Sequence, residues 1–347
     1  MMTHHEKRFR VLITDPISQS CIDILKENNI DVTYKPKLAL EEILKEIPEY
    51  EILIVRSGTK VTKEVLNVAN KLMLVGRAGT GVDNVDMDAA TRRGVVVMKQ
   101  CTRWQHNQCC RTHMCHANGY GQVKQNKQIT NKITLDIPQA CNSMKLNKWE
   151  RNLFMGTEIH GKTLAIVGLG RVGRAVAFRM QAFGMKTVGY DPIITAETAK
   201  SFGVQLFPLE ELWPKADFIT LHVPLDAETK HLINDDVFAK CRRGVRIINV
   251  ARGGIVNEEA LLNALVNGNC AGAALDVFAE EPPRNVALIQ HIKVICTPHL
   301  GANTTEAQLE VSKQIAKQIV EFVNHKALIG VVNGYGVFSV NFWSFSK

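Results

Sequence analysis

The sequence predicts a doubly wound α/β fold built as two domains. Short apolar runs rich in β-branched residues alternate with segments of helical periodicity, which is the pattern of parallel strands connected by helices. The first series of runs comprises Phe9–Thr14, Ile52–Val55 and Leu72–Val75. The second series comprises Thr163–Gly168, Lys186–Tyr190, Asp217–His222, Val245–Asn249, Ala271–Asp276 and Lys293–Thr297. Two series indicate two domains, with ligands bound at the carboxyl ends of the strands in a cleft between them.

Composition is that of a soluble globular protein. The 347 residues are enough for two cores, and 46% hydrophobic and 22% charged residues are ordinary values. The sequence contains neither a long apolar stretch nor a secretory signal, so we expect no membrane partner and a cytoplasmic location. Nine cysteines in such a chain indicate reduced thiols. The formal net charge of +8 fits an anionic ligand, or a dispersed surplus of Lys and Arg without a function.

A glycine-rich turn follows the first strand of the second series. The residues Gly168-Leu169-Gly170-Arg171-Val172-Gly173 stand between an apolar run and a helical pattern. In this arrangement Gly168 permits a tight turn, Gly170 lets the backbone approach a pyrophosphate, and Gly173 lets helix and strand pack closely. Asp191 ends the next strand, where a carboxylate accepts the 2′-hydroxyl of NAD and repels the 2′-phosphate of NADP. The sequence therefore predicts an NAD site in place of an ordinary βα turn.

Three polar segments follow later strands of the same series. They contain Arg252 before two glycines, Asp276 with the nearby Glu281, and His299 after a proline. Taken singly, they fit a surface arginine, helix-start carboxylates and a loop histidine. Because the carboxyl ends of parallel strands meet at one edge of a sheet, together they indicate a catalytic constellation.

The motifs GLGRVG, YDP, NVARGGIVNEEAL, ALDVFAEEPP and TPHLGA resemble those of the D-isomer-specific 2-hydroxyacid dehydrogenases. The segments VRSGTKVT, VGRAGTGVDNVD, KWERNLFMGTEIHGKTL and RMQAFGMKTVGYDP extend the resemblance to about residues 8–98 and 137–333. The resemblance implies two Rossmann-like domains with the active site in the cleft between them. It also implies NAD as the cofactor and a homodimer formed through the cofactor domain.

The resemblance further assigns catalytic roles. His299 would take the hydroxyl proton of the substrate as hydride leaves for NAD, which suits a side chain that changes charge near neutral pH. Glu281 would hold the second imidazole nitrogen and favour the protonated ring, with Glu280 as the competing carboxylate. Arg252 would bind the substrate carboxylate through two hydrogen bonds and polarise the reacting carbonyl.

Binding residues are assigned by the same resemblance, and no metal is expected. Asp276 would line the nicotinamide end of the cleft, and Val223 stands where related sequences carry Thr. The cofactor-binding positions are Thr80, Gly168, Gly170, Arg171, Val172, Gly173, Asp191, Val223, Val250, Ala251, Asp276 and Gly301. The substrate-binding positions are Arg56, Arg77, Ala78 and Gly79, whose two guanidinium groups suit a phosphate-bearing substrate.

The resemblance implies oxidation of a small phosphorylated 2-hydroxy acid, 3-phospho-D-glycerate, to 3-phosphohydroxypyruvate in serine biosynthesis. Three alternatives stay open. A glyoxylate or hydroxypyruvate reductase of the same family would use the same arginine, glutamate and histidine. A non-catalytic protein of the family would bind a peptide and sense NAD. An inactive product would result if residues 99–136 replace the hinge helix of the family.

We expect a discontinuous substrate-binding (catalytic) domain from residues 1–98 and 303–333, and an NAD-binding domain from residues 137–302. Residues 334–347 form a tail that no longer resembles the family. Residues 99–136 interrupt the strand–helix alternation. This segment is rich in candidate zinc ligands, namely Cys101, His106, Cys109, Cys110, His113, Cys115 and His116.

Two functional interpretations of the interrupting segment are weak. No CxxC pair is followed by a second pair at the spacing of a zinc finger, which argues against a metal site. Arg103, Trp104 and Arg111 are too few to form a nucleic-acid footprint. We therefore expect no nucleic-acid partner.

A third interpretation is that the segment is translated out of frame. An admissible codon sequence for Thr102–Gly121, read one base later, encodes PGGNTISAAELTCAMLMAM, which is the glycine-rich loop and apolar hinge helix that the family carries here. The codons of Gln122–Lys124 can spell a splice donor, and residues 123–136 are then an insertion. We hypothesise a frameshift followed by a retained intron, and we expect a chain that folds poorly or is weakly active without its hinge helix.

Overall fold

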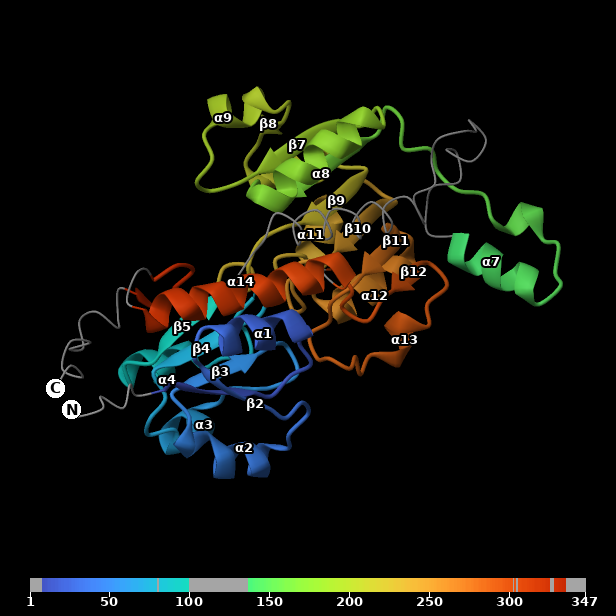
Figure 1. Cartoon of the computed structure of the whole chain (residues 1–347). Coiled ribbons are helices and arrows are strands. Elements are labelled where there is room, and N and C mark those ends of the chain that lie inside the picture. The colour runs from blue at the N-terminus through green and yellow to red at the C-terminus, as the bar shows by residue number, and fades with distance from the viewer. Residues whose placement is uncertain are drawn as a thin grey trace, which may run out of the picture. The chain divides into compact units, whose positions relative to one another are not determined.

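The computed structural model describes residues 8–79, 81–99, 137–301, 303, 305–324 and 328–334 of the chain (Figure 1). The chain divides into two compact units. The first unit comprises Met1–Gln105 with Thr304–Lys347, and the second comprises His106–Asn303. The boundaries predicted for the two domains, and the cleft between them, stay predictions. The interrupting segment with its candidate zinc ligands lies outside the described residues from position 100 onward.

The first unit is a parallel sheet of five described strands in the order β2-β1-β3-β4-β5. The strands are β1 (Arg10–Ile13), β2 (Asp31–Tyr34), β3 (Ile52–Val55), β4 (Leu74–Arg77) and β5 (Val96–Lys99). The helices are α1 (Gln19–Glu27), α2 (Leu40–Glu46), α3 (Lys63–Val68), α4 (Met87–Arg92) and α14 (Thr305–Val323), with a 3₁₀ turn at Ile47–Glu49. All three strands predicted here are present, and β2 and β5 are additional.

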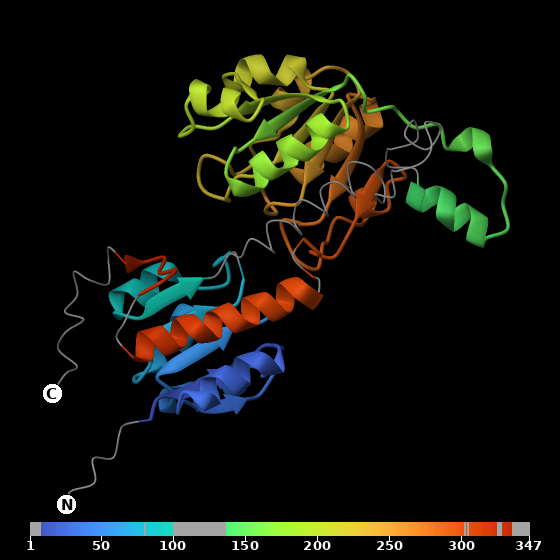
Figure 2. The same cartoon turned by 45° about the horizontal axis from the view of Figure 1, so that its top comes forward.

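Helix α14 joins the first unit although it lies about 200 residues beyond β5 in the sequence. Figure 2 shows this long red helix lying along the sheet beside α1. Its buried Val311, Ile315, Ile319 and Phe322 pack with the apolar face of β1, β3 and β4 in one core cluster. A Cβ on Gly76 of β4 would lie 3.2 Å from Ile315, so helix and strand approach closely at this glycine. Helices α2, α3 and α4 cover the opposite face of the sheet.

Edge strand β5 is bordered by the segment 328–334. Met98 and Val331 form an antiparallel bridge, and Asn333 accepts a hydrogen bond from the backbone N–H of Val97 at 2.9 Å. The amide of Asn333 also donates to the carbonyl of Val95. The chain therefore completes the first unit with residues from both of its ends.

The second unit is a parallel sheet of seven described strands in the order β12-β11-β10-β9-β6-β7-β8. The strands are β6 (Thr163–Val167), β7 (Lys186–Tyr190), β8 (Gln205–Leu206), β9 (Phe218–Leu221), β10 (Val245–Asn249), β11 (Cys270–Leu275) and β12 (Val294–Cys296). The helices are α7 (Ile137–Lys145), α8 (Arg171–Ala182), α9 (Ala196–Ser201), α10 (Leu209–Leu212), α11 (Asp235–Lys240), α12 (Glu258–Asn267) and α13 (Val286–Ile289). Short 3₁₀ turns lie at Arg151–Leu153 and Trp213–Lys215.

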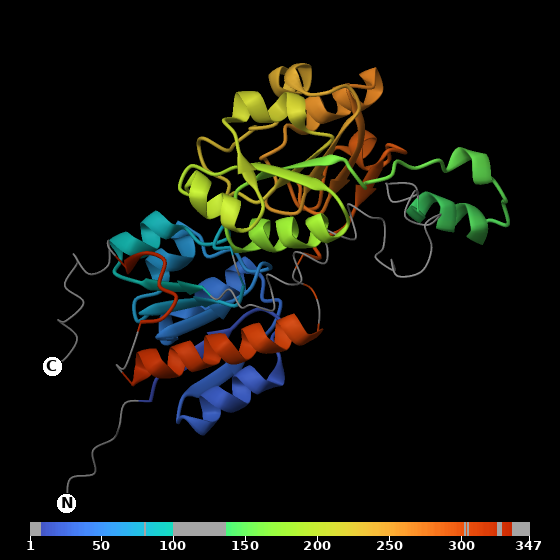
Figure 3. The ribbon, with the colours of Figure 1, turned by 90° about the horizontal axis from the view of Figure 1, so that it is seen from above.

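Helices cover both faces of the seven-stranded sheet (Figure 3). Buried residues of α11 and α12 belong to one core cluster, and those of α8 and α9 belong to another. Because β6 lies between β7 and β9, the strand order reverses beside the end of β6, which is where doubly wound proteins bind their ligands. The predicted α/β class with two doubly wound units is confirmed. Within the described residues, no helix is long and apolar enough to cross a membrane.

Candidate active site

The glycine-rich turn occupies the reversal point at the end of β6. Gly168 has φ +92°, and a Cβ there would lie 2.6 Å from the carbonyl oxygen of His222, so only glycine fits. A Cβ on Gly173 would overlap the carbonyl oxygen of Gly168, which lets α8 start directly against the strand. A Cβ on Gly170, by contrast, would meet nothing within 4 Å. The first N–H groups of α8 are thus accessible from the side on which Gly170 lies.

Asp191 follows β7, next to the glycine turn. One of its carboxylate oxygens accepts the N–H of Leu169 at 2.7 Å, and the other accepts the N–H groups of Ile193 and Ile194 at 2.9 and 3.0 Å. The carboxylate therefore joins the two loops at the ends of β6 and β7. Two carboxylate oxygens offer about four acceptor positions, so the half-buried Asp191 keeps capacity for a ribose hydroxyl.

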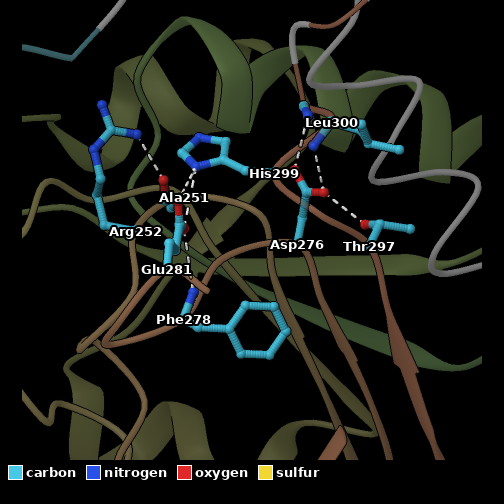
Figure 4. Close-up of polar contacts among 9 residues, drawn as sticks. Ala251, Arg252, Asp276, Phe278, Glu281, Thr297, His299 and Leu300 are labelled. Atoms are coloured by element: carbon cyan, nitrogen blue, oxygen red, sulfur yellow. Dashed lines mark hydrogen bonds and ion pairs between the residues drawn. The ribbon is translucent and has the colours of Figure 1, made fainter. Parts of the chain in front are cut away.

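His299 and Glu281 form a pair after β12 and β11 (Figure 4). The Nδ1 atom of His299 lies 2.9 and 3.1 Å from the two carboxylate oxygens of Glu281. Both side chains are nearly half exposed, at 45% and 42%. An apolar hollow of about 420 Å³ with Phe278 and Ile289 in its wall adjoins the pair. Glu280 instead pairs with Arg284 at 2.6 Å, so the geometry favours Glu281 as the partner of the imidazole.

The loop that carries His299 is held by the buried carboxylate of Asp276. This carboxylate accepts the hydroxyl of Thr297 at 2.6 Å and the N–H groups of Leu300 and Gly301 at 2.7 and 2.8 Å. Asp276 is fully buried, and its backbone carbonyl accepts the N–H of His299. His299 has φ +52°, a left-handed conformation that is costly outside glycine. The hydrogen bonds to Asp276 on both sides of His299 fix this conformation.

Arg252 leaves the end of β10 in a turn that Asn249 closes. The buried amide of Asn249 donates to the carbonyl of Arg252 at 2.8 Å and accepts the N–H of Ala251 at 3.1 Å. The guanidinium of Arg252 donates from Nη1 to the carbonyl of Ala251 at 2.6 Å, as Figure 4 shows. A Cβ on Gly253 would overlap the carbonyl of Phe278, so this turn also packs directly on the loop that leads to Glu281.

Two family profiles match the chain in succession. The profile described as "D-isomer specific 2-hydroxyacid dehydrogenase, catalytic domain" matches residues 11–102. The profile described as "D-isomer specific 2-hydroxyacid dehydrogenase, NAD binding domain" matches residues 131–301, which contain the glycine turn, Arg252, Glu281 and His299. The chain belongs to the D-isomer-specific 2-hydroxyacid dehydrogenase family. The predicted family and the NAD-binding domain are thereby confirmed.

Relatives within the 2-hydroxyacid dehydrogenase family are close in sequence. The chain is 53% identical over 330 residues to D-3-phosphoglycerate dehydrogenase of Rattus norvegicus, which covers 95% of this chain and 59% of the relative. It is 42% identical over 326 residues to D-3-phosphoglycerate dehydrogenase of Bacillus subtilis, with 94% and 59% of the two chains covered. The chain therefore spans about 59% of the length of these relatives.

Solved structures of similar proteins share the fold. The TT0316 protein from Thermus thermophilus superposes with a TM-score of 0.78 at 28% identity, covering 93% of this chain and all of that one. D-lactate dehydrogenase from Aquifex aeolicus, complexed with NAD and lactic acid, gives a TM-score of 0.78 at 25% identity, covering 93% and 99%.

The predicted substrate residues of this family member lie in the first unit. Arg56 follows β3 and Arg77 ends β4, so both stand at the carboxyl ends of paired strands. Burial lowers the pKa of the Arg56 guanidinium, and the carboxylate of Asp15 acts in the opposite direction. Ala78 and Gly79 continue from Arg77, with the N–H of Ala78 bonded to the carbonyl of Val55. Thr80 lies outside the described residues.

The remaining residues predicted to bind the cofactor lie at the same end of the second sheet. Arg171 and Val172 open α8, Val250 and Ala251 follow β10, and the buried Gly301 follows the His299 loop. Val223 packs against the core cluster that contains β6 and β9. Beside it, burial lowers the pKa of His222 to about 3, so this imidazole stays neutral. No group of described His, Cys, Asp or Glu residues could hold a metal ion.

Sequence reasoning missed the residues that position the site. Asn249 closes the Arg252 turn, and Glu258 accepts the N–H of Ala279 at 2.7 Å. Asp15 accepts the N–H groups of Arg56 and Thr59 at 2.5 and 3.1 Å. Asn249 ends an apolar strand and Asp15 follows one, so a polar residue at the carboxyl end of a strand was a sequence signal for both. Glu258 begins a helix, and no sequence signal pointed to its contact with Ala279.

Proposed function

We propose that the chain catalyses the NAD-dependent oxidation of 3-phospho-D-glycerate to 3-phosphohydroxypyruvate, as in serine biosynthesis. The observation that carries the proposal is the pairing of Nδ1 of His299 with Glu281 at 2.9 Å in a domain of the NAD-binding type. The identity of 53% to a D-3-phosphoglycerate dehydrogenase supports the choice of substrate. Two arginines at the carboxyl ends of β3 and β4, Arg56 and Arg77, suit a phosphate group.

The residues at the end of β6 fit NAD. The open space at Gly170 leaves room for a pyrophosphate against the first turn of α8, and Asp191 offers an acceptor for the ribose. NAD, when bound, supplies the acceptor for the hydride. Side chains of this protein carry out substrate binding and proton transfer.

The contact between His299 and Glu281 supports proton transfer at one nitrogen of the imidazole. An ionised carboxylate only accepts hydrogen bonds, so Glu281 selects the ring form in which Nδ1 carries the hydrogen. The Nε2 atom of His299 is then the acceptor for the hydroxyl proton of the substrate. The developing charge on the ring is stabilised by Glu281, and Arg252 holds the substrate carboxylate through its planar guanidinium.

A comparison of substrates tests this proposal. The expected result is NADH formation with 3-phospho-D-glycerate and a kcat/KM at least tenfold lower with D-glycerate or glycolate. Equal kcat/KM for phosphorylated and unphosphorylated acids would support a glyoxylate or hydroxypyruvate reductase instead. NAD binding without turnover of any of these acids would support a non-catalytic protein.

We further propose that residues 102–136 weaken the activity of the chain as written. Residues 103–130 fall between the matches of the two family profiles, which supports the frameshift hypothesis. A reframed chain can be made in which Thr102–Tyr120 are replaced by PGGNTISAAELTCAMLMAM and Val123–Asp136 are deleted. We expect the reframed chain to have at least tenfold higher kcat than the chain as written. Equal activity of the two chains, or a transcript that encodes residues 98–140 as printed, would contradict the hypothesis.

A homodimer formed through the second unit belongs to the same proposal. The segment from α7 to β6 exposes five large apolar side chains, each more than half accessible: Met144, Leu146, Trp149, Leu153 and Met155. Such a concentration of exposed apolar groups is typical of a protein interface. Light scattering of the reframed chain should give a dimer, and the double variant Trp149→Glu/Met155→Glu should be monomeric.

The five described cysteines are free thiols, which supports a cytoplasmic location.

A further inference from the structure

Two adjoining hollows open at the amino end of the second sheet. The larger, of about 1040 Å³, is bordered by the first residues of β6, β7 and β8, which are Thr163, Lys186 and Gln205. The smaller, of about 160 Å³, is bordered by the first residues of β9 and β10, and both hollows share Arg242. Gly168 and Asp191 follow the opposite ends of β6 and β7, about 16 Å away along a five-residue strand. The smaller hollow and the amino-end wall of the larger one are therefore distant from the cofactor end, while the larger hollow continues along β7 and β8 past Val188 and Leu206.

Positive side chains dominate the walls of these hollows. Seven Lys or Arg residues contribute to the walls, against one carboxylate among the described lining residues, Asp217. Both oxygens of Asp217 are engaged, one by the guanidinium of Arg242 at 3.3 Å and the other by the N–H of Thr163 at 2.8 Å. The remaining cations of the walls are Lys162, Lys186, Lys200, Lys215, Arg243 and Arg246.

Three of the cations are already held in place. Arg246 donates to the hydroxyl of Thr157 at 2.7 Å and lies over the ring of Phe218 at 5.5 Å. Arg242 donates from Nε to the carbonyl of Pro214 at 2.8 Å, and the ammonium of Lys215 lies 4.8 Å from the ring of Phe207. Cations that are fixed before binding lose less conformational entropy when an anion arrives.

We propose that these hollows form a second anion site, which binds an oligophosphate carrying two or more phosphate groups. One phosphate occupies the smaller hollow near Lys162, Arg243 and Arg246, and the rest of the molecule extends past Arg242 into the larger one. The volume of the larger hollow is that of a small-molecule site. Binding of a nucleic-acid strand is disfavoured, because Lys215 and Arg246 lie over the rings that would stack on bases.

Titration calorimetry of the full chain with inorganic tripolyphosphate tests the site. We expect binding whose Kd is unchanged by saturating NAD, because the cofactor binds at the other end of the sheet. The exposed pair Lys200→Glu/Arg243→Glu should weaken binding at least tenfold, and Lys200→Gln/Arg243→Gln should give an intermediate Kd. The matched control Lys26→Glu/Lys45→Glu changes the same charge on the first unit and should stay within twofold of the parent. Thermal unfolding confirms that each variant is folded.

Several outcomes would overturn the proposal. They are absence of tripolyphosphate binding, displacement of tripolyphosphate by NAD, and equal weakening in the control pair. Tighter binding of a single-stranded oligonucleotide than of tripolyphosphate would also overturn it. With NAD saturating, a parallel titration with ATP identifies the source of the phosphates. Tighter binding of ATP than of tripolyphosphate supports a nucleotide ligand at this site, and the reverse supports an inorganic one.

Discussion

The two ends of the seven-stranded sheet use polar residues in different ways. At the carboxyl end, the side chains of Asn249 and Asp276 bond backbone groups of the loops that carry Arg252 and His299. The side chain of Asp191 likewise joins the loops after β6 and β7. At the amino end, Asp217 accepts the N–H of Thr163, and most of the polar side chains that line the hollows are long cations. Activity at the carboxyl end should thus depend on individual residues, whereas anion binding at the amino end should depend on the total charge of several cations. Single substitutions should therefore have large effects at one end and small effects at the other.

The largest effect is expected at His299. In the reframed chain, His299→Gln should lower kcat by about 10³-fold, because the substrate hydroxyl then has no base to accept its proton. Glu281→Gln should lower kcat less, by about 10–100-fold, because it removes only the group that orients and stabilises the ring. Steady-state kinetics measure both values. A kcat for His299→Gln within tenfold of the parent would remove His299 from the mechanism.

A smaller effect is expected at Asp276. Asp276→Asn replaces one acceptor oxygen by an NH2 group that faces the N–H of either Leu300 or Gly301. The free energy of unfolding should fall by about 1–3 kcal/mol, and kcat should fall with it. Denaturant unfolding measures the change. The control Glu280→Gln alters an exposed carboxylate paired with Arg284 and should cost less than about 1 kcal/mol. Equal losses in the two variants would show that Asp276 does not hold the loop.

The partly buried His222 should make stability depend on pH. Its folded pKa of about 3 lies below the value of an unfolded histidine, so the unfolded chain binds an extra proton as pH falls below about 6.5. The free energy of unfolding should therefore fall by about 1 kcal/mol per pH unit between pH 6 and 4. His222→Gln should remove this slope, whereas the exposed control His160→Gln should keep it. The same slope in both variants would mean that other groups cause the dependence.

The smallest effect is expected at the amino end. Lys186→Ala removes one of several exposed cations and should weaken tripolyphosphate binding by about twofold while leaving kcat unchanged. Calorimetry and kinetics on one preparation measure both quantities. A tenfold loss of binding from this single change would mean that tripolyphosphate affinity depends on Lys186 itself and not on the total charge of the hollow.

Much of the fold could be predicted because buried parallel strands are mostly apolar and rich in β-branched residues. The runs at Ile52–Val55, Lys186–Tyr190 and Val245–Asn249 coincide with β3, β7 and β10. Three strands, β2, β5 and β8, were missed. β2 (DVTY) is an edge strand with an exposed, polar pattern, and β8 has only two residues. The predicted run Leu72–Val75 starts two residues before β4, since Leu72 still turns back to bond the carbonyl of Ala69.

The sequence predicts the chemically reactive residues of the candidate site but not the residues that hold them in place. Arg252, Glu281 and His299 stood out because each follows an apolar strand. The choice of Glu281 over Glu280 came from the family resemblance, and the contacts of the two side chains agree with it. The function of Asp276 in holding the loop depends on three donors from residues 297–301, and no local pattern shows such contacts. The cations at strand starts lie far apart in sequence, so their clustering was invisible as well.

Helix α14 has a consequence for the order of events during synthesis. Residues 10–99 contain all five described strands of the first sheet. One apolar face of this sheet is covered by Val311, Ile315 and Phe322 of α14, which is made only about 200 residues later. At ~5–20 residues per second, that delay lasts roughly 10–40 s. Over this interval the ribosome carries a half-covered sheet while the second unit emerges complete. The second unit can therefore complete its fold before the first unit receives its last helix.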